Sequence, residues 1–265
     1  MKNFNFFFLA LILLGTTGCE GVDFNDLKDL VIEQPHEEVR EVLPAKHLVI
    51  IADGTGSTSG TYAIPQVTTE WLEACIDRIR NTGGGSLFLT KVDRDSRNNQ
   101  VHNLTIPQAA YVPARPAHRP GVTSFDYNRE VETWEKTIPK YRRDSIDASQ
   151  RFARKRVDFL KMAANYLQTE VYHQGLDNQA SDLIGTLNSA NGALKDISDP
   201  TANKYIVAFS DMEHFPMRNF PSKELMPIPS DTELIMVNPA TGSTDMVTDA
   251  REVSSPDRVL DILFH

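Results

Sequence analysis

The sequence contains only two cysteines, Cys19 and Cys75, among 265 residues. A chain with so few cannot be a small disulfide-stapled domain, so a folded body must depend on its hydrophobic core. The chain also has no excess of positive charge, because 27 Lys and Arg stand against 36 Asp and Glu and the formal net charge is -9. This balance argues against binding of nucleic acid or anionic lipid through bulk charge.

Three motifs of common enzyme classes are also missing. No Gly-Lys-Ser or Gly-Lys-Thr ends a glycine-rich loop, so the sequence has no P-loop for a nucleotide phosphate. The histidines do not form the H-E-x-x-H pattern of zinc proteases, and no G-x-S-x-G elbow presents a nucleophilic serine. The sequence therefore gives no support to these three enzyme classes.

The apolar run over residues 6–14 is too short to span a bilayer. It follows Lys2 and precedes small residues, which is the pattern of a secretory signal peptide. The stretch Thr-Thr-Gly-Cys ending at Cys19 resembles the end of a bacterial lipoprotein signal, although Thr16 stands where Leu is usual. The resemblance implies that residues 1–18 are removed and that Cys19 receives lipid. Residues 19–46 would then tether a domain to a membrane of the cell envelope, on its periplasmic or surface side. The alternative is an ordinary signal cleaved nearby.

From residue 47 onward, apolar runs alternate with helical patterns. Runs at 48–52, 86–92, 101–106, 204–209 and 234–237 indicate strands, with a hairpin turn over 93–100. Apolar residues repeat at helical spacing over 65–81, 182–197 and 256–264. Pro65 fits a first helical turn, and Cys75 falls on the apolar side of that helix. The alternation predicts one α/β domain over 47–265: a three-layer, doubly wound, mostly parallel sheet with helices on both faces.

An insertion of about residues 107–174 interrupts this alternation. Its first part, 107–121, is rich in proline and predicts an extended loop. Residues 128–173 are strongly charged and predict one broken helix or two helices, interrupted near Pro139. Much of the basic charge of the chain lies here, so we expect the insertion to help choose a partner.

Two of the apolar runs end in an aspartate. The run at 48–52 leads into Asp53-Gly-Thr55-Gly-Ser57, and the run at 204–209 leads into Ser210-Asp211. In open α/β sheets ligands bind beyond the carboxyl ends of the strands, so both clusters are expected at one edge. Carboxylate and hydroxyl oxygens suit Mg²⁺, and glycines let the loop turn tightly. A polar turn without a ligand is the simpler interpretation.

In this arrangement the chain resembles von Willebrand factor A-type (integrin I-like) domains over about residues 46–239, apart from the insertion. That family carries a metal-ion-dependent adhesion site, whose first motif is Asp-x-Ser-x-Ser. Asp53, Thr55 and Ser57 match it, with Thr in place of the first Ser. The family's last acid often stands in Ser-Asp-Gly and matches Asp211, which Met212 follows here.

The family's intermediate ligand is usually a Thr on a loop. Ser181-Asp182 occupies a similar place in this chain, which makes Asp182 the candidate ligand. Thr186, one helical turn further on, is the alternative.

The resemblance implies an exported binding domain, rather than an enzyme, that binds Mg²⁺ or another divalent cation. Through the cation it would bind a protein partner that supplies a carboxylate, while lipid on Cys19 holds it at the membrane. Two other classes stay open. One is a metal-dependent phosphohydrolase or an actin-like ATPase, whose phosphate loop the stretch "DGTGST" mimics. The other is a structural envelope domain with a degenerate site.

Overall fold

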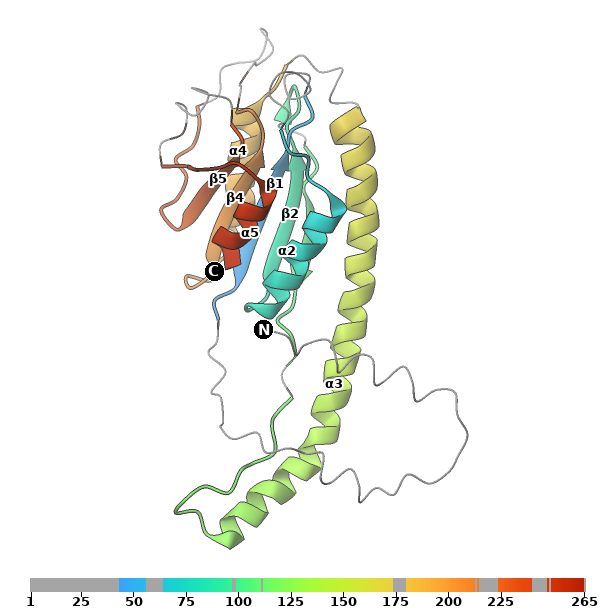
Figure 1. The fold of residues 1–265 in the computed structure, drawn as a ribbon, viewed down its shortest axis with the longest axis vertical. Helices are drawn as coiled ribbons and strands as arrows, with labels where there is room; N and C mark the ends of the chain where they lie inside the picture. The colour runs from blue at the N-terminus through green and yellow to red at the C-terminus, as the bar shows by residue number, and fades with distance from the viewer. Residues whose placement is uncertain are drawn as a thin grey trace, which may run out of the picture.

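The computed structural model describes residues 43–55, 64–96, 99–110, 112–173, 180–212, 214, 224–239, 247 and 249–264. A six-stranded sheet in this part of the chain has the order β3-β2-β1-β4-β5-β6 (Figure 1). The strands are β1 Lys46–Ala52, β2 Gly85–Lys91, β3 His102–Ile106, β4 Asn203–Phe209, β5 Thr232–Val237 and β6 Arg251–Val253. Only β2 and β3 pair antiparallel. The predicted α/β class with a mostly parallel sheet is confirmed.

Helices cover both faces of the sheet. They are α2 Thr69–Asn81, α3 Ser124–Asn165, the π-helical η4 Tyr166–His173, α4 Leu183–Lys195 and α5 Pro256–Phe264. Leu48 and Ile50 of β1 belong to the core shared with α2, α3, η4 and α5. Val49 and Ile51 point to the opposite face, which α4 covers. Because both faces of β1 are buried over 48–52, this part of the strand is an unbroken apolar run.

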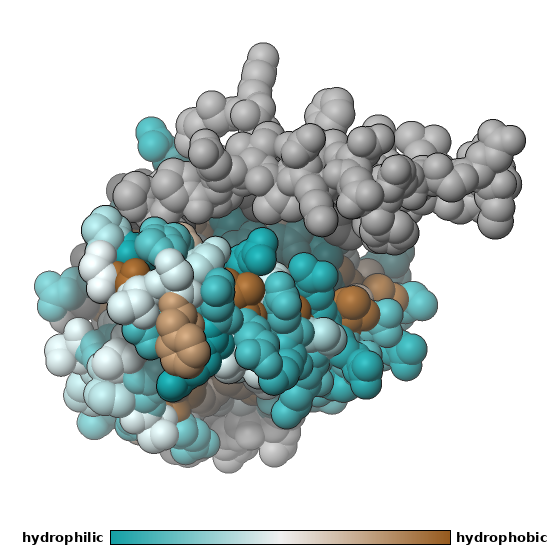
Figure 2. Space-filling model, turned by 90° about the horizontal axis from the view of Figure 1, so that it is seen from below, coloured by the Kyte–Doolittle hydropathy of each residue, from teal (hydrophilic) through white to brown (hydrophobic). Residues whose placement is uncertain are grey.

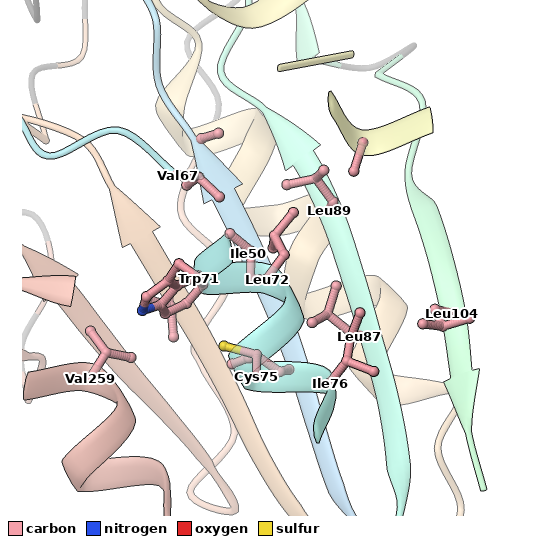
Figure 3. Close-up of a cluster of buried hydrophobic side chains, with 14 of the residues drawn as sticks. Ile50, Val67, Trp71, Leu72, Cys75, Ile76, Leu87, Leu89, Leu104 and Val259 are labelled. Carbon is pink, nitrogen blue, oxygen red and sulfur yellow. The ribbon is translucent and has the colours of Figure 1, made fainter. Parts of the chain in front are cut away.

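The larger core lies under α2 (Figure 3). The Trp71 ring meets Phe209 of β4 edge-on, with centroids 5.0 Å apart, and its Nε1 donates to the Pro256 carbonyl at 3.1 Å. Trp71 thereby joins α2 to β4 and to the start of α5. Cys75 is fully buried beside Leu72, which confirms its predicted place on the apolar side of α2.

The start of α2 differs from the sequence prediction. Pro65 lies before the helix, whose N-cap is Thr68. The Thr68 hydroxyl accepts a hydrogen bond from the Trp71 backbone N–H at 3.2 Å. Capping by a side-chain oxygen satisfies one of the donors that a helix start leaves unpaired, which a proline at residue 65 cannot do.

The break predicted near Pro139 is wrong, because α3 runs through Pro139 as one helix of 42 residues. An internal proline removes one backbone donor and crowds the preceding turn, at a cost of about 3 kcal/mol. Figure 1 shows the helix axis bending in its N-terminal half, which is the usual response to such a residue. Burial of the neighbouring Ile138 helps to keep the helix continuous across the bend.

The N-terminal half of α3 and the chain before it form an arm that projects past the start of the strands (Figure 1). Trp134 Nε1 donates to the Pro113 carbonyl at 3.0 Å, and Arg119 pairs with Glu130 at 3.3 Å. These contacts hold the proline-rich stretch against the helix. Seen from this end, the described surface is mainly hydrophilic, with separate hydrophobic side chains between the polar ones (Figure 2).

Two features of the fold were not predicted from the sequence, namely β6 and the π-helix η4. None of the helices in the described part of the chain is both long enough and apolar enough to cross a membrane. Cys19 and Ser57 lie outside the described residues, so the predictions made for them stay predictions.

Candidate functional site

The order of the strands changes direction beside β1. The chain passes from β1 to β2 and β3 on one side, then continues with β4 on the other side of β1. Ligands of open α/β sheets bind at such a switch point, beyond the carboxyl ends of the strands. Ala52 and Phe209 are register partners, and the Asp53 backbone N–H donates to the Phe209 carbonyl at 3.0 Å. The residues that follow β1 and β4 therefore meet at this edge.

The Asp53 carboxylate is buried and accepts three hydrogen bonds from the residues that the structure describes. Oδ1 accepts from the Thr55 backbone N–H at 3.0 Å and from the Thr55 hydroxyl at 2.8 Å. Oδ2 accepts from the Ser210 hydroxyl at 2.7 Å. Ser210 was not among the predicted site residues, yet it joins the two strand ends. The one sequence signal was its place between the apolar run of β4 and Asp211.

The carboxyl groups of Asp53 and Asp211 lie close enough at this edge for their charges to repel each other. Burial raises the pKa of Asp53 above its ordinary value of 3.8, because the ionised form loses its hydration. Hydrogen bonds from Ser210 and Thr55 oppose this shift, and the nearby carboxylate of Asp211 adds to it. Asp211 is itself 1% exposed. A cation beside both groups would offset the loss of hydration and the mutual repulsion.

The hydroxyl groups at this edge are oriented by Asp53. A hydroxyl has one proton to donate and two lone pairs that accept. Because Thr55 and Ser210 both donate their proton to Asp53, each acts toward any further partner as an acceptor. The Ser210 oxygen already accepts from the Met212 backbone N–H at 3.0 Å. Lone pairs of neutral oxygens beside carboxylates are the ligands that Mg²⁺ prefers, so the residues present suit such an ion.

Met212 follows Asp211 with a φ of +62°, in the left-handed region. Residues other than Gly rarely adopt this conformation, which costs about 1 kcal/mol. The side chain of Met212 is fully buried in the core under α4, and that burial offsets the strain. The turn after β4 is therefore held in a strained conformation directly beside the two acids.

Asp182 has a structural role one strand away. As the N-cap of α4 it accepts from the Gly185 backbone N–H at 3.0 Å, and its other oxygen accepts from the Ser96 backbone N–H at 3.0 Å. The Ser96 hydroxyl lies 2.6 Å from the hydroxyl of Thr186. These bonds fasten the segment after β2 to the start of α4. The roles of Asp182 and Thr186 as metal ligands stay predictions.

The end of the insertion packs against the loop that follows β1. A Cβ atom on Gly54 would lie 2.1 Å from the backbone oxygen of Val171 in η4. The next residue, Tyr172, accepts from the Val67 backbone N–H at 2.7 Å through its hydroxyl. Only a residue without a side chain fits between Asp53 and η4 at this distance.

The structure thus brings together three of the predicted residues, Asp53, Thr55 and Asp211, with Ser210 in addition. The described residues contain no group of three or more His, Cys, Asp or Glu side chains that could hold a metal ion. A cation at this edge would depend on hydroxyl oxygens as well as on the two acids.

No known protein family matches the chain, and no curated protein matches it.

Proposed function

We propose that the chain is a von Willebrand factor A-like binding protein that holds a divalent cation at the switch point of its sheet. Asp53, Thr55, Ser57 and Asp211 would hold the ion, which a protein partner would approach with a carboxylate of its own. The observation that carries the proposal is the pair of buried acids at this edge, Asp53 and Asp211. The Asp53 carboxylate also accepts hydrogen bonds from the hydroxyls of Thr55 and Ser210.

The chemistry of these side chains supports a hard cation. Mg²⁺ prefers oxygen ligands and usually keeps several waters, so two acids and two hydroxyls would leave positions for a partner. The cation would place a positive charge beside the two buried acids. Asp53 would orient the Thr55 hydroxyl through the hydrogen bond that it accepts at 2.8 Å.

The proposed setting is the bacterial cell envelope. A signal peptide over residues 1–18, lipid on Cys19 and a tether over 19–46 would place the domain at a membrane surface. Adhesion through a metal needs no chemical step, so the proposed function is binding and not catalysis.

Thermal melting in EDTA and in Mg²⁺ tests the metal. At free Mg²⁺ about 100-fold above Kd, binding stabilises the folded state by about 2.7 kcal/mol. For a domain of this size, that corresponds to a rise in melting temperature of about 5–10 °C. Asp53→Ala and Asp211→Ala should fold without metal, because each removes one of two repelling charges, and should lose the rise. The matched control is Asp144→Ala, which removes an exposed acid of α3 and should keep it.

The same experiment distinguishes the alternatives. A rise that needs Mg²⁺ and ATP together would indicate an ATPase. No rise in wild type under any condition would leave the loop as a polar turn and overturn the proposal. Asp182→Ala should be melted in EDTA and in Mg²⁺. If its melting temperature is lower than that of wild type in both, but still rises with Mg²⁺, Asp182 only caps α4. Loss of the Mg²⁺ effect would make it a ligand.

A further inference from the structure

A second surface, separate from the sheet edge, lies on α3. Ile146, Ala153 and Val157 fall within about 40° of one another around the helix at 100° per residue. All three are exposed, and the two large ones, Ile146 and Val157, are 57% and 48% exposed. We call these three residues the apolar strip.

Basic side chains border the apolar strip along one side. Arg143, Arg154 and Lys161 are exposed and lie about 40–100° further around the helix. None of the three makes an ion pair with the described residues. Residues 140–161 contain eight Lys and Arg against three Asp, in a chain whose net charge is -9. This surface therefore suits an acidic partner that also carries apolar side chains.

The apolar strip lies beside the face of α3 that contacts α2. Arg156 pairs with Glu73 and Asp77 of α2 at 2.8 and 2.9 Å, and Arg80 of α2 donates to Ser149 at 3.1 Å. Ser149 and Arg156 lie about 60–80° around the helix from the middle of the strip, on the side opposite Arg143, Arg154 and Lys161. The strip is thus next to the contact between the two helices.

The first described residue, Leu43, lies beside the turn that ends α2. A Cβ atom on Gly83, in the turn that ends α2, would lie 2.5 Å from the Leu43 carbonyl oxygen. This turn follows Arg80, which bonds Ser149 of α3. Residues 1–42 therefore join the folded body at the turn that ends α2, and the last turn of α2 contacts the middle of α3 through Arg80.

The last part of that segment has the complementary chemistry. Residues 20–42 contain eight Asp and Glu against one Lys and one Arg. Phe24, Leu27 and Val31 are separated by three and four positions in the sequence, and the residues of the apolar strip by seven and four. Both spacings correspond to whole turns of a helix. Fully extended, 23 residues reach about 75 Å, while the helix from Arg143 to Lys161 is about 27 Å long.

We infer that residues 20–42 bind along the apolar strip of α3, with their acids against Arg143, Arg154 and Lys161. The chain supplies this partner at an effective concentration in the millimolar range, which favours it over a partner from solution. A second copy of the chain would bring like charges together at α3, which opposes dimers through this face. The segment predicted to be a tether would in this way fix how the domain stands relative to its anchor.

Cleavage by chymotrypsin after Phe24 tests the inference on the full chain in a mild detergent. Wild type should be cut slowly at 50 mM salt and faster at 500 mM, because salt screens exposed charges. Arg143→Glu with Arg154→Glu should be cut about tenfold faster, since exposed ion pairs become repulsions. The matched control, Lys155→Glu with Lys195→Glu, changes the net charge equally and should be cut as wild type is.

A charge swap identifies the contact as direct. Adding Glu33→Arg and Glu37→Arg to the Arg143→Glu, Arg154→Glu chain should restore slow cleavage. Equal rates in all variants, or a swap that fails to restore protection, would overturn the inference. So would protection that depends on protein concentration, since a second copy of the chain would then cover the strip.

Discussion

Substitution of Gly54 by Ala probes the contact between the loop after β1 and η4. The new Cβ would lie 2.1 Å from the backbone oxygen and 2.6 Å from the backbone carbon of Val171. Ordinary carbon contacts are about 3.5–4.0 Å. Because both atoms belong to the backbone, no side-chain rotation relieves the clash, and either the loop or η4 must move.

The expected cost follows from two opposing effects. Overpacking of a close contact destabilises by about 1–3 kcal/mol. Loss of glycine flexibility in the unfolded chain stabilises by about 0.4–1 kcal/mol where the backbone conformation allows alanine, as it does at residue 54. We therefore expect Gly54→Ala to lower the free energy of unfolding by about 1–2 kcal/mol. The displaced loop should also weaken the Mg²⁺-dependent rise in melting temperature.

Gly192→Ala is the matched control. Gly192 lies inside α4, and a Cβ there meets nothing within 4 Å. The same chemical change should stabilise the protein by about 0.5–1 kcal/mol, because alanine favours a helix interior. Urea unfolding followed by circular dichroism, with equal m-values, measures both changes. A Gly54→Ala chain as stable as wild type, or as Gly192→Ala, would refute a close contact between η4 and the loop.

Two further predictions concern ionisation and lipid. The folded-state pKa of Asp53 is raised, so its ionisation destabilises the metal-free protein near neutral pH, and this penalty fades as pH falls toward 3.8. In EDTA, the melting-temperature difference between Asp53→Asn and wild type should shift in favour of wild type from pH 7 to pH 4; a constant difference would contradict the assigned burial. Growth with a fatty-acid analogue should label wild type and leave Cys19→Ser unlabelled, and equal labelling of both, or of neither, removes the anchor.

The sequence predicted the strands that are buried on both faces of the sheet. Because the candidate site follows the ends of two such strands, its position could be predicted as well. The last four or five residues of β1 and β4 are all apolar, so the ends of these strands could be identified and Asp53 and Asp211 expected at one edge. Ser210 was missed as a site residue because its role depends on register: Ala52 pairs with Phe209, which brings the next residues together. Register between strands about 150 residues apart has no local signal.

Local rules failed where tertiary packing decided the outcome. Pro139 signals a helix break, yet α3 accommodates it by bending. β6 has only three residues and none of them is buried, so no hydrophobic period could reveal it. The closeness of Gly54 to Val171 joins positions more than a hundred residues apart, and a glycine between polar residues predicts only a turn.

The end of the insertion, η4, packs against the segments that surround the candidate site. Three consecutive residues of η4 contact three separate segments there: Glu170 lies 3.7 Å from Lys91 at the end of β2, Val171 packs on Gly54, and the Tyr172 hydroxyl accepts from the backbone before α2. A π-helix has a wider turn than an α-helix and is often found at functional sites. The apolar strip lies on α3, before η4, and the basic residues beside it make no ion pair with these segments. Charge reversal at Arg143 and Arg154 should therefore leave the Mg²⁺ effect unchanged, whereas Gly54→Ala should weaken it and leave cleavage after Phe24 unaltered. If either variant changed both readouts, α3 would transmit a displacement between its basic surface and the loop that carries Asp53.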